Sequence, residues 1–101
     1  GLRAQGRLEE SGGGQRVPGQ SVRLSCRWYG WQAGAVWWYR QAPGGSPDWL
    51  STCDYSRNWY GPAVEGRALV SRDSSRSEVS LSLGALQPQD SARYFCAVHT
   101  G

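Results

Sequence analysis

The chain contains no lysine, methionine or isoleucine, and it has a single histidine, His99. It also lacks any long apolar run, since the longest covers only residues 34–39, whereas a membrane-spanning helix needs about 20 apolar residues. No window repeats its apolar residues with the helical period over about ten positions. We therefore expect no direct membrane insertion of this segment and no substantial helix.

Residues that carry catalysis or bind metals are also scarce. His99 has no nucleophile implied beside it, and the eight acidic residues are dispersed without a paired-carboxylate pattern. The three cysteines lack the close spacing of zinc ligands. We expect no enzyme activity, no cofactor and no metal site.

Arginine supplies all eleven basic side chains and gives a formal net charge of +3 at pH 7. A nucleic-acid-binding surface normally gathers such residues into a run or a stripe. Here the arginines are scattered and interleaved with Asp and Glu, so the sequence predicts no nucleic-acid partner.

Large aromatic residues are abundant instead, with six Trp and five Tyr in 101 residues. A core of this size needs only one or two Trp. We therefore expect part of the surplus at the surface, where Trp and Tyr anchor interfaces.

Short segments with alternating apolar and polar residues are separated by positions rich in Gly and Pro. The clearest are residues 21–26, 79–83 and 92–96. Period-two alternation over short runs is typical of antiparallel strands with one buried face. Residues 1–101 are predicted to form a single all-β domain, a sandwich or a small barrel.

Cys26 and Cys96 both fall on the inward face of such a strand, 70 positions apart. A disulfide between them would join two sheets and contribute about 4 kcal/mol by constraining the unfolded chain. It would also imply an oxidising, extracellular compartment. Cys53 is then left as either a buried free thiol or the partner of a cysteine in a later loop.

Five further segments make a family resemblance specific: residues 10–14 (ESGGG), 21–26 (SVRLSC), 38–44 (WYRQAPG), 66–73 and 90–97 (DSARYFCA). They occur in the order seen in an immunoglobulin heavy-chain variable domain, and the spacing of Cys26, Trp38 and Cys96 is that of an immunoglobulin fold. The chain therefore resembles a V-set domain of an antibody, or of a T-cell receptor chain with a heavy-chain-like variable domain of the delta or mu type. The framework does not separate these two classes.

The resemblance implies a V-type β-sandwich of two antiparallel sheets with Greek-key connections. In such a domain Trp38 packs on the Cys26–Cys96 disulfide, and Tyr94 forms the tyrosine corner. Arg67 and Asp90 are expected to form an ion pair, within a charge cluster that includes Arg40 and Asp48. The joining segment is missing after residue 98, so the last strand of the family fold is expected to be absent.

One face of the sheet is predicted to carry an aromatic patch opposite the core residue Trp38. By alternation and by resemblance, its members are Trp37, Tyr39, Gln41, Pro47, Trp49 and Phe95. A patch of several hundred Å² rarely stays bare. We expect a second variable domain or a long third loop of the same chain to cover it.

Two segments rich in aromatic, Gly, Ser and Asn residues, 28–34 and 54–60, match the composition of antibody paratopes. Trp28 has an alternative place, tucked inward as a cap of the sandwich. The predicted ligand-binding loop residues are Trp28, Tyr29, Trp31, Gln32, Asp54, Tyr55, Arg57, Asn58, Trp59 and His99.

The function implied is recognition of a protein or other antigen by a variable domain of a lymphocyte receptor, secreted or on the outside of a cell. Constant domains of the same receptor are further expected partners. Two alternatives stay open: an invariant variable-like spacer or surrogate-chain domain, and a cell-adhesion module on the same sandwich.

Overall fold

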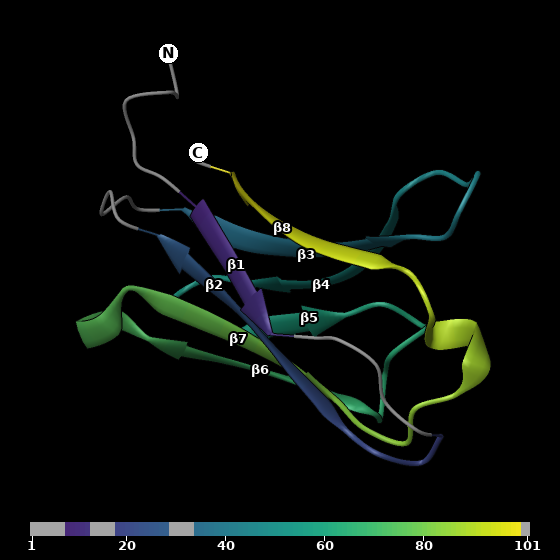
Figure 1. Cartoon of the computed structure of the whole chain (residues 1–101). Coiled ribbons are helices and arrows are strands. Elements are labelled where there is room, and N and C mark those ends of the chain that lie inside the picture. Colours follow the sequence, from purple (N-terminus) through teal and green to yellow (C-terminus); the bar gives the residue numbers. More distant parts are fainter. Residues whose placement is uncertain (1–7, 13–17, 29–33, 100–101) are drawn as a thin grey trace.

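The computed structural model describes residues 8–12, 18–28 and 34–99, which form two antiparallel four-stranded sheets packed face to face (Figure 1). One sheet has the order β1-β2-β7-β6 and the other the order β5-β4-β3-β8. The strands are β1 (Leu8–Gly12), β2 (Val22–Trp28), β3 (Ala35–Gln41), β4 (Asp48–Cys53), β5 (Asn58–Tyr60), β6 (Ala68–Asp73), β7 (Glu78–Leu83) and β8 (Arg93–His99), and two short 3₁₀ helices are η2 (Ser74–Arg76) and η3 (Pro88–Asp90).

The predicted alternation accounts for the residues that the β1-β2-β7-β6 sheet buries on its inner face. Leu24 of β2 lies opposite Leu81 of β7, and Cys26 lies opposite Val79. Directly opposed residues of an antiparallel pair point to the same side. Cys26, Leu81 and Val79 are buried, and Leu24 packs against them. The all-β sandwich predicted from the sequence is confirmed.

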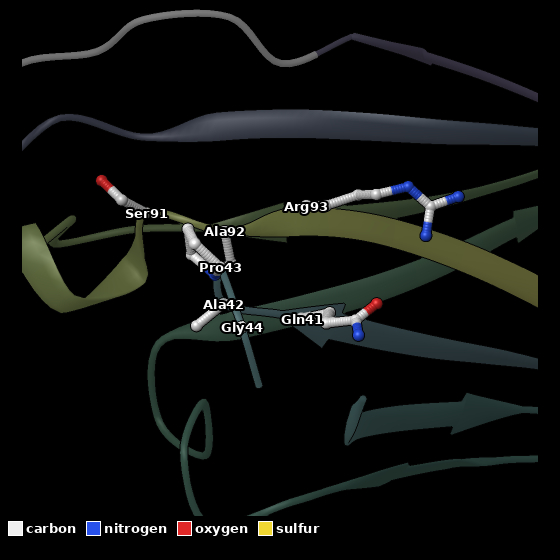
Figure 2. A pocket seen from close by; sticks show the side chains of 7 residues that line it. All are labelled: Gln41, Ala42, Pro43, Gly44, Ser91, Ala92 and Arg93. Atoms are coloured by element: carbon white, nitrogen blue, oxygen red, sulfur yellow. The ribbon is translucent and has the colours of Figure 1, made fainter. Parts of the chain in front are cut away.

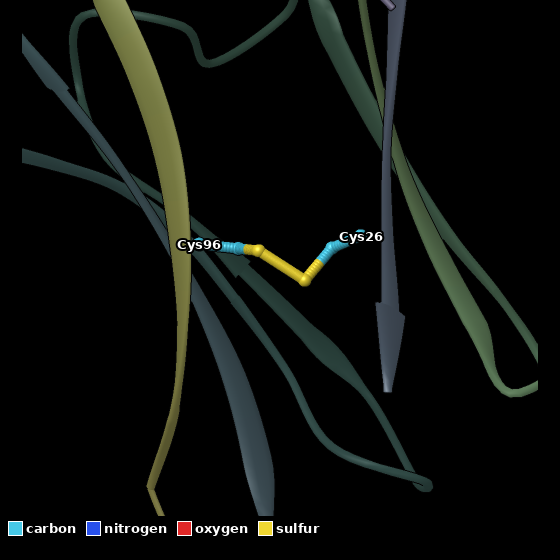
Figure 3. Close-up of a disulfide and its surroundings, with 2 residues drawn as sticks. All are labelled: Cys26 and Cys96. Carbon is cyan, nitrogen blue, oxygen red and sulfur yellow. A yellow bond between two sulfur atoms is a disulfide. The ribbon is translucent and has the colours of Figure 1, made fainter. Parts of the chain in front are cut away.

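The two sheets are joined by the predicted disulfide. Cys26 of β2 and Cys96 of β8 form a bridge that crosses the space between the sheets (Figure 3). Trp38 lies opposite Cys96 in the β3–β8 register and is only 1% exposed. The prediction that Trp38 and the disulfide share the centre of the core is confirmed, and both belong to one cluster with Leu50 and Val64.

A charged corner closes one end of the sandwich. Arg67 donates hydrogen bonds to both carboxylate oxygens of Asp90, at 2.9 and 3.0 Å, and Arg40 donates a third at 2.9 Å. The Tyr94 hydroxyl donates to the Asp90 carbonyl at 2.7 Å, the tyrosine corner that the resemblance implies. Asp48 belongs to the predicted cluster but forms no ion pair with any residue of the described ranges.

The guanidinium of Arg67 lowers the pKa of the Asp90 carboxyl far below its ordinary range, against the opposing effect of burial. The backbone N–H of Gln87 and the Arg40 side chain lower it further. Burial lowers the pKa of Arg40, but its hydrogen bonds to Tyr94 and Asp90 outweigh this effect and leave the pKa raised. Asp90 is therefore held as an anion between two cations.

Candidate functional site

The β4–β5 hairpin presents an exposed tip, residues 54–57, whose backbone is held by one carboxylate. Oδ1 of Asp54 accepts hydrogen bonds from the backbone N–H of Ser56 at 2.8 Å, from the Ser56 hydroxyl at 2.9 Å and from the backbone N–H of Arg57 at 2.9 Å. The Asp54 N–H donates to the Arg57 carbonyl at 3.1 Å. The Arg57 and Ser56 hydrogen bonds lower the pKa of Asp54, so the side chain stays ionised and the turn stays closed.

The hairpin carries the most exposed large aromatic residues of the described chain, Tyr55 on the tip and Trp59 on strand β5. Tyr55 is 85% exposed and Trp59 is 37% exposed. The guanidinium carbon of Arg57 lies 4.6 Å from the centroid of a Trp59 ring, within the range of a cation–π contact. Large rigid side chains on a closed turn lose little entropy when they bind a partner.

Asn58 and Trp59 lie in strand β5, so their assignment to a loop is wrong. The Asn58 side-chain amide donates to the Val70 carbonyl of β6 at 3.0 Å, which ties the hairpin to the other sheet. Asn58 therefore serves the fold. Trp59 keeps an exposed face because it lies opposite Thr52 on the outer side of its sheet.

The first predicted loop lies largely outside the described residues. This applies to Tyr29, Trp31 and Gln32. Trp28 is the last residue of β2, so its backbone belongs to a strand and not to the loop as predicted.

Aromatic rings gather on the outer face of the sheet formed by β5, β4, β3 and β8, as predicted. The ring of Trp37 lies 6.3 Å from that of Tyr39 and 6.5 Å from that of Trp49, and Tyr39 stacks on Phe95 at 5.4 Å. Arg93 covers the outer side of Phe95 at 4.6 Å. These contacts leave the four aromatic residues half-buried, less exposed than a bare surface patch would be.

Trp49 is held in place from two sides. Its indole N–H donates to the Thr52 hydroxyl at 2.8 Å. A Cβ at Gly61 would lie 3.0 Å from the Trp49 carbonyl oxygen and 3.2 Å from its ring. Glycine at position 61 therefore lets the chain pass directly against Trp49.

Gln41 and Pro47 complete the predicted face in different ways. The Gln41 amide donates to the Gly45 carbonyl at 2.7 Å, so its N–H is engaged within its own turn. Pro47 is exposed.

His99 was predicted to be a ligand-binding residue of a loop; its placement in a loop is wrong, and its role in binding stays a prediction. It is the last residue of strand β8, opposite Ala35 of β3. Its ring lies 4.5 Å from the Trp37 ring, and its Nε2 lies 3.4 Å from the Tyr39 hydroxyl. His99 extends the aromatic face, a place that the sequence could have shown through the parity of positions 95, 97 and 99.

Cys53 is a free thiol in the core, 2% exposed, so the described residues contain no second disulfide. Its Sγ lies 3.4 Å from the Asp54 carbonyl oxygen. Burial raises the pKa of the thiol, so the reactive thiolate is disfavoured. Among the described residues Cys53 is therefore a buried free thiol, and a bridge to a cysteine in a later loop stays a prediction.

A groove of about 430 Å³ lies between the β3–β4 turn and the start of β8 (Figure 2). It is shaped mainly by small and apolar side chains and was not predicted, because its two walls are about 50 positions apart in the sequence. Its lining residues are Gln41, Ala42, Pro43, Gly44, Ser91, Ala92 and Arg93. With no His, Cys or carboxylate in that lining, the groove has no catalytic set.

Within residues 8–12, 18–28 and 34–99, no three His, Cys, Asp or Glu residues come together as a metal-binding group. No helix among the described residues is long and apolar enough to cross a membrane.

Comparison with protein families identifies the architecture. A family model described as "Immunoglobulin V-set domain" matches residues 14–101.

Proposed function

Since the chain belongs to the immunoglobulin V-set family, we propose that it is an antigen-recognition domain of a lymphocyte receptor, which binds its ligand through the β4–β5 hairpin and the first loop predicted from the sequence. V-set domains are in general binding modules that mediate protein–protein contacts and typically lie outside the cell. The proposed recognition requires no chemistry. The domain would act in a secreted protein or on the outer part of a cell-surface receptor.

The structure of the β4–β5 hairpin is the main support for this proposal. It combines a turn closed by Asp54 with the exposed rings of Tyr55 and Trp59. A spacer domain would have no need of rigid, exposed aromatic side chains, which favour self-association when bare. A recognition domain uses them to bury a large area with few ordered torsions.

The aromatic face supports a second, compatible interaction. Trp37, Tyr39, Trp49 and Phe95 form a contiguous half-buried layer on one side of the sandwich, and the exposed His99 packs on Trp37 at its end. We propose that a second variable domain, or the third loop of the same receptor chain, packs on it. Tyr39 resembles the residue of unpaired domains, and Pro47 replaces the Leu usual in pairing domains, which favours the loop. Trp49 and Gln41 resemble a pairing domain, which favours the second variable domain. Sedimentation at rising concentration is the test, and a monomer with this face open at every concentration would contradict it.

The recognition function can be tested with a multivalent form of the chain on an array of extracellular proteins. We expect Tyr55→Ala and Trp59→Ala to abolish binding to the selected protein, without lowering the melting temperature. Trp31→Ala, in the first loop, should weaken it as well. Leu69→Ala is the matched control, because Leu69 is 64% exposed on strand β6 of the other sheet and is not part of the hairpin.

Binding that survives Tyr55→Ala and Trp59→Ala would contradict the proposed site. The spacer and surrogate-chain alternative predicts identical loops in every clone, whereas recognition predicts loops that differ between clones. An adhesion module predicts one fixed partner on another cell. Sequencing the chain from many lymphocyte clones therefore separates recognition from the other two functions.

A further inference from the structure

We propose that the β4–β5 hairpin binds a carboxylate side chain, Asp or Glu, set in an apolar part of a protein partner, and that Arg57 is the residue that binds it. This inference rests on the proposed recognition function and names the chemistry of the ligand. It starts from the stacked arrangement of Arg57 on Trp59.

Within the part of the chain that the structure describes, the guanidinium over Trp59 has no carboxylate in an ion pair with it. The closest acidic residue along the hairpin, Asp54, attracts it at longer range, but Oδ1 of Asp54 already accepts three hydrogen bonds that close the turn. Residues 29–33 contain no Asp or Glu, so the first loop cannot supply a carboxylate either.

The position of Arg57 also leaves its donors available to a partner. A guanidinium is a planar fork of N–H donors, and its carbon lies over one side of a Trp59 ring, which leaves the other side of the group open. Arg57 is itself exposed, so its donors are accessible to a partner. A carboxylate that approaches them can accept two parallel N–H hydrogen bonds.

The surroundings favour a carboxylate on a protein over a polyanion. The side chains beside Arg57 on the hairpin are those of Tyr55, Ser56, Asn58 and Trp59, none of which is basic. A nucleic acid or a sulfated polysaccharide would require several cations along one stripe. One cation over the Trp59 ring, on a hairpin that also exposes Tyr55, matches one acidic side chain surrounded by apolar groups.

The test uses the 101-residue chain and three capped tripeptides as probes: Leu-Glu-Leu, Leu-Gln-Leu and Leu-Lys-Leu. Chemical shifts of the Arg57 Nε–H and the Trp59 indole N–H report binding at the hairpin. We expect Leu-Glu-Leu to bind about five-fold more tightly than Leu-Gln-Leu, the order of one solvent-exposed ion pair, and Leu-Lys-Leu to bind most weakly. Arg57→Gln should remove this preference, and Arg76→Gln, at an exposed arginine on the turn between β6 and β7, should retain it.

Each other outcome overturns the inference. If Leu-Glu-Leu and Leu-Gln-Leu change the chemical shift of the Trp59 indole N–H equally, the hairpin binds partners without a preference for carboxylates, and the recognition function stands. If the preference survives Arg57→Gln, the carboxylate binds elsewhere. If a heparin oligosaccharide binds more tightly than Leu-Glu-Leu and is weakened alike by Arg57→Gln and Arg76→Gln, the surface recognises polyanions. No response at Trp59 to any peptide, together with loss of binding on the protein array, contradicts the function as well as the inference.

Discussion

Arg67 holds Asp90 by both carboxylate oxygens, with its Nη1 2.9 Å from Oδ2 and its Nη2 3.0 Å from Oδ1. Arg67 also donates to the carbonyls of Ala63, Gly84 and Ala85. A single side chain thus ties the segment before β6, the loop after β7 and η3 together. The corner depends on this one pair, although the binding loops lie in other segments of the chain.

Removing either member of the pair should destabilise the domain. We expect Arg67→Ala and Asp90→Ala each to lower the free energy of unfolding by about 1–3 kcal/mol. Arg67→Ala leaves Asp90 with Arg40 as its one cation, and Asp90→Ala leaves both arginines without their carboxylate in a partly buried site. Chemical denaturation measures this, with Arg76→Ala as the exposed control, expected to change the value by less than about 0.5 kcal/mol. Midpoints equal to that of the wild type would show that the pair contributes nothing.

The same pair predicts loss of stability in acid. The pKa of Asp90 is lowered in the folded state, so its contribution is fully present above the unfolded value of about 4 and is lost as the pH falls below it. We expect the stability difference between wild type and Asp90→Asn to be constant from about pH 7 to pH 5 and to shrink by about 2 kcal/mol or more toward pH 2. A difference that stays constant over the whole range would contradict the lowered pKa.

The Tyr94 hydroxyl should contribute more than the Tyr39 hydroxyl. It donates to the Asp90 carbonyl at 2.7 Å and accepts from Arg40 at 3.1 Å, and Tyr94→Phe leaves the carbonyl without this donor and Arg40 with its hydrogen bond to Asp90 alone. We expect a loss of about 1–3 kcal/mol. Tyr39→Phe is the matched control, because its hydroxyl has only a 3.4 Å contact with His99 and should cost about 0.5 kcal/mol or less. If Tyr94→Phe and Tyr39→Phe lower the free energy of unfolding equally, the hydroxyl of the tyrosine corner does not stabilise the domain.

Thiol counting tests the cysteine assignment. Without a reductant, we expect the folded chain to react very slowly with a thiol reagent, because Cys53 is buried and its pKa is raised. Unfolding in denaturant should expose one thiol per chain, and reduction should expose three, because Cys26 and Cys96 are joined. Mass mapping that found Cys53 bridged to Cys26 or Cys96 would contradict the strand assignment.

Local patterns in the sequence are sufficient for the sandwich and its disulfide. Alternation places Cys26 and Cys96 on inward faces, and their neighbours in register are apolar. A period of two residues depends only on the geometry of a strand, so it can be read without knowledge of which strands meet. The same parity predicted that Trp37 and Tyr39 lie opposite the core residue Trp38.

The ends of strands were harder to predict, because hydrogen bonds to a distant partner decide where a strand stops. Asn58 and Trp59 have the composition of a loop, but pairing of β5 with β4 and the bond from Asn58 to Val70 make them part of a strand. His99 likewise joins β8 because β3 continues alongside it.

The amino-acid sequence alone determined the fold, the disulfide and the set of aromatic residues available for recognition, because burial parity and residue type are local properties. Only the tertiary structure decided how those residues are used. It showed Cys53 buried, His99 stacked on Trp37, and Arg57 held on Trp59 without a described acidic partner within ion-pair distance. Those arrangements depend on side chains from strands and turns brought together in space, and on the charges that do or do not meet there.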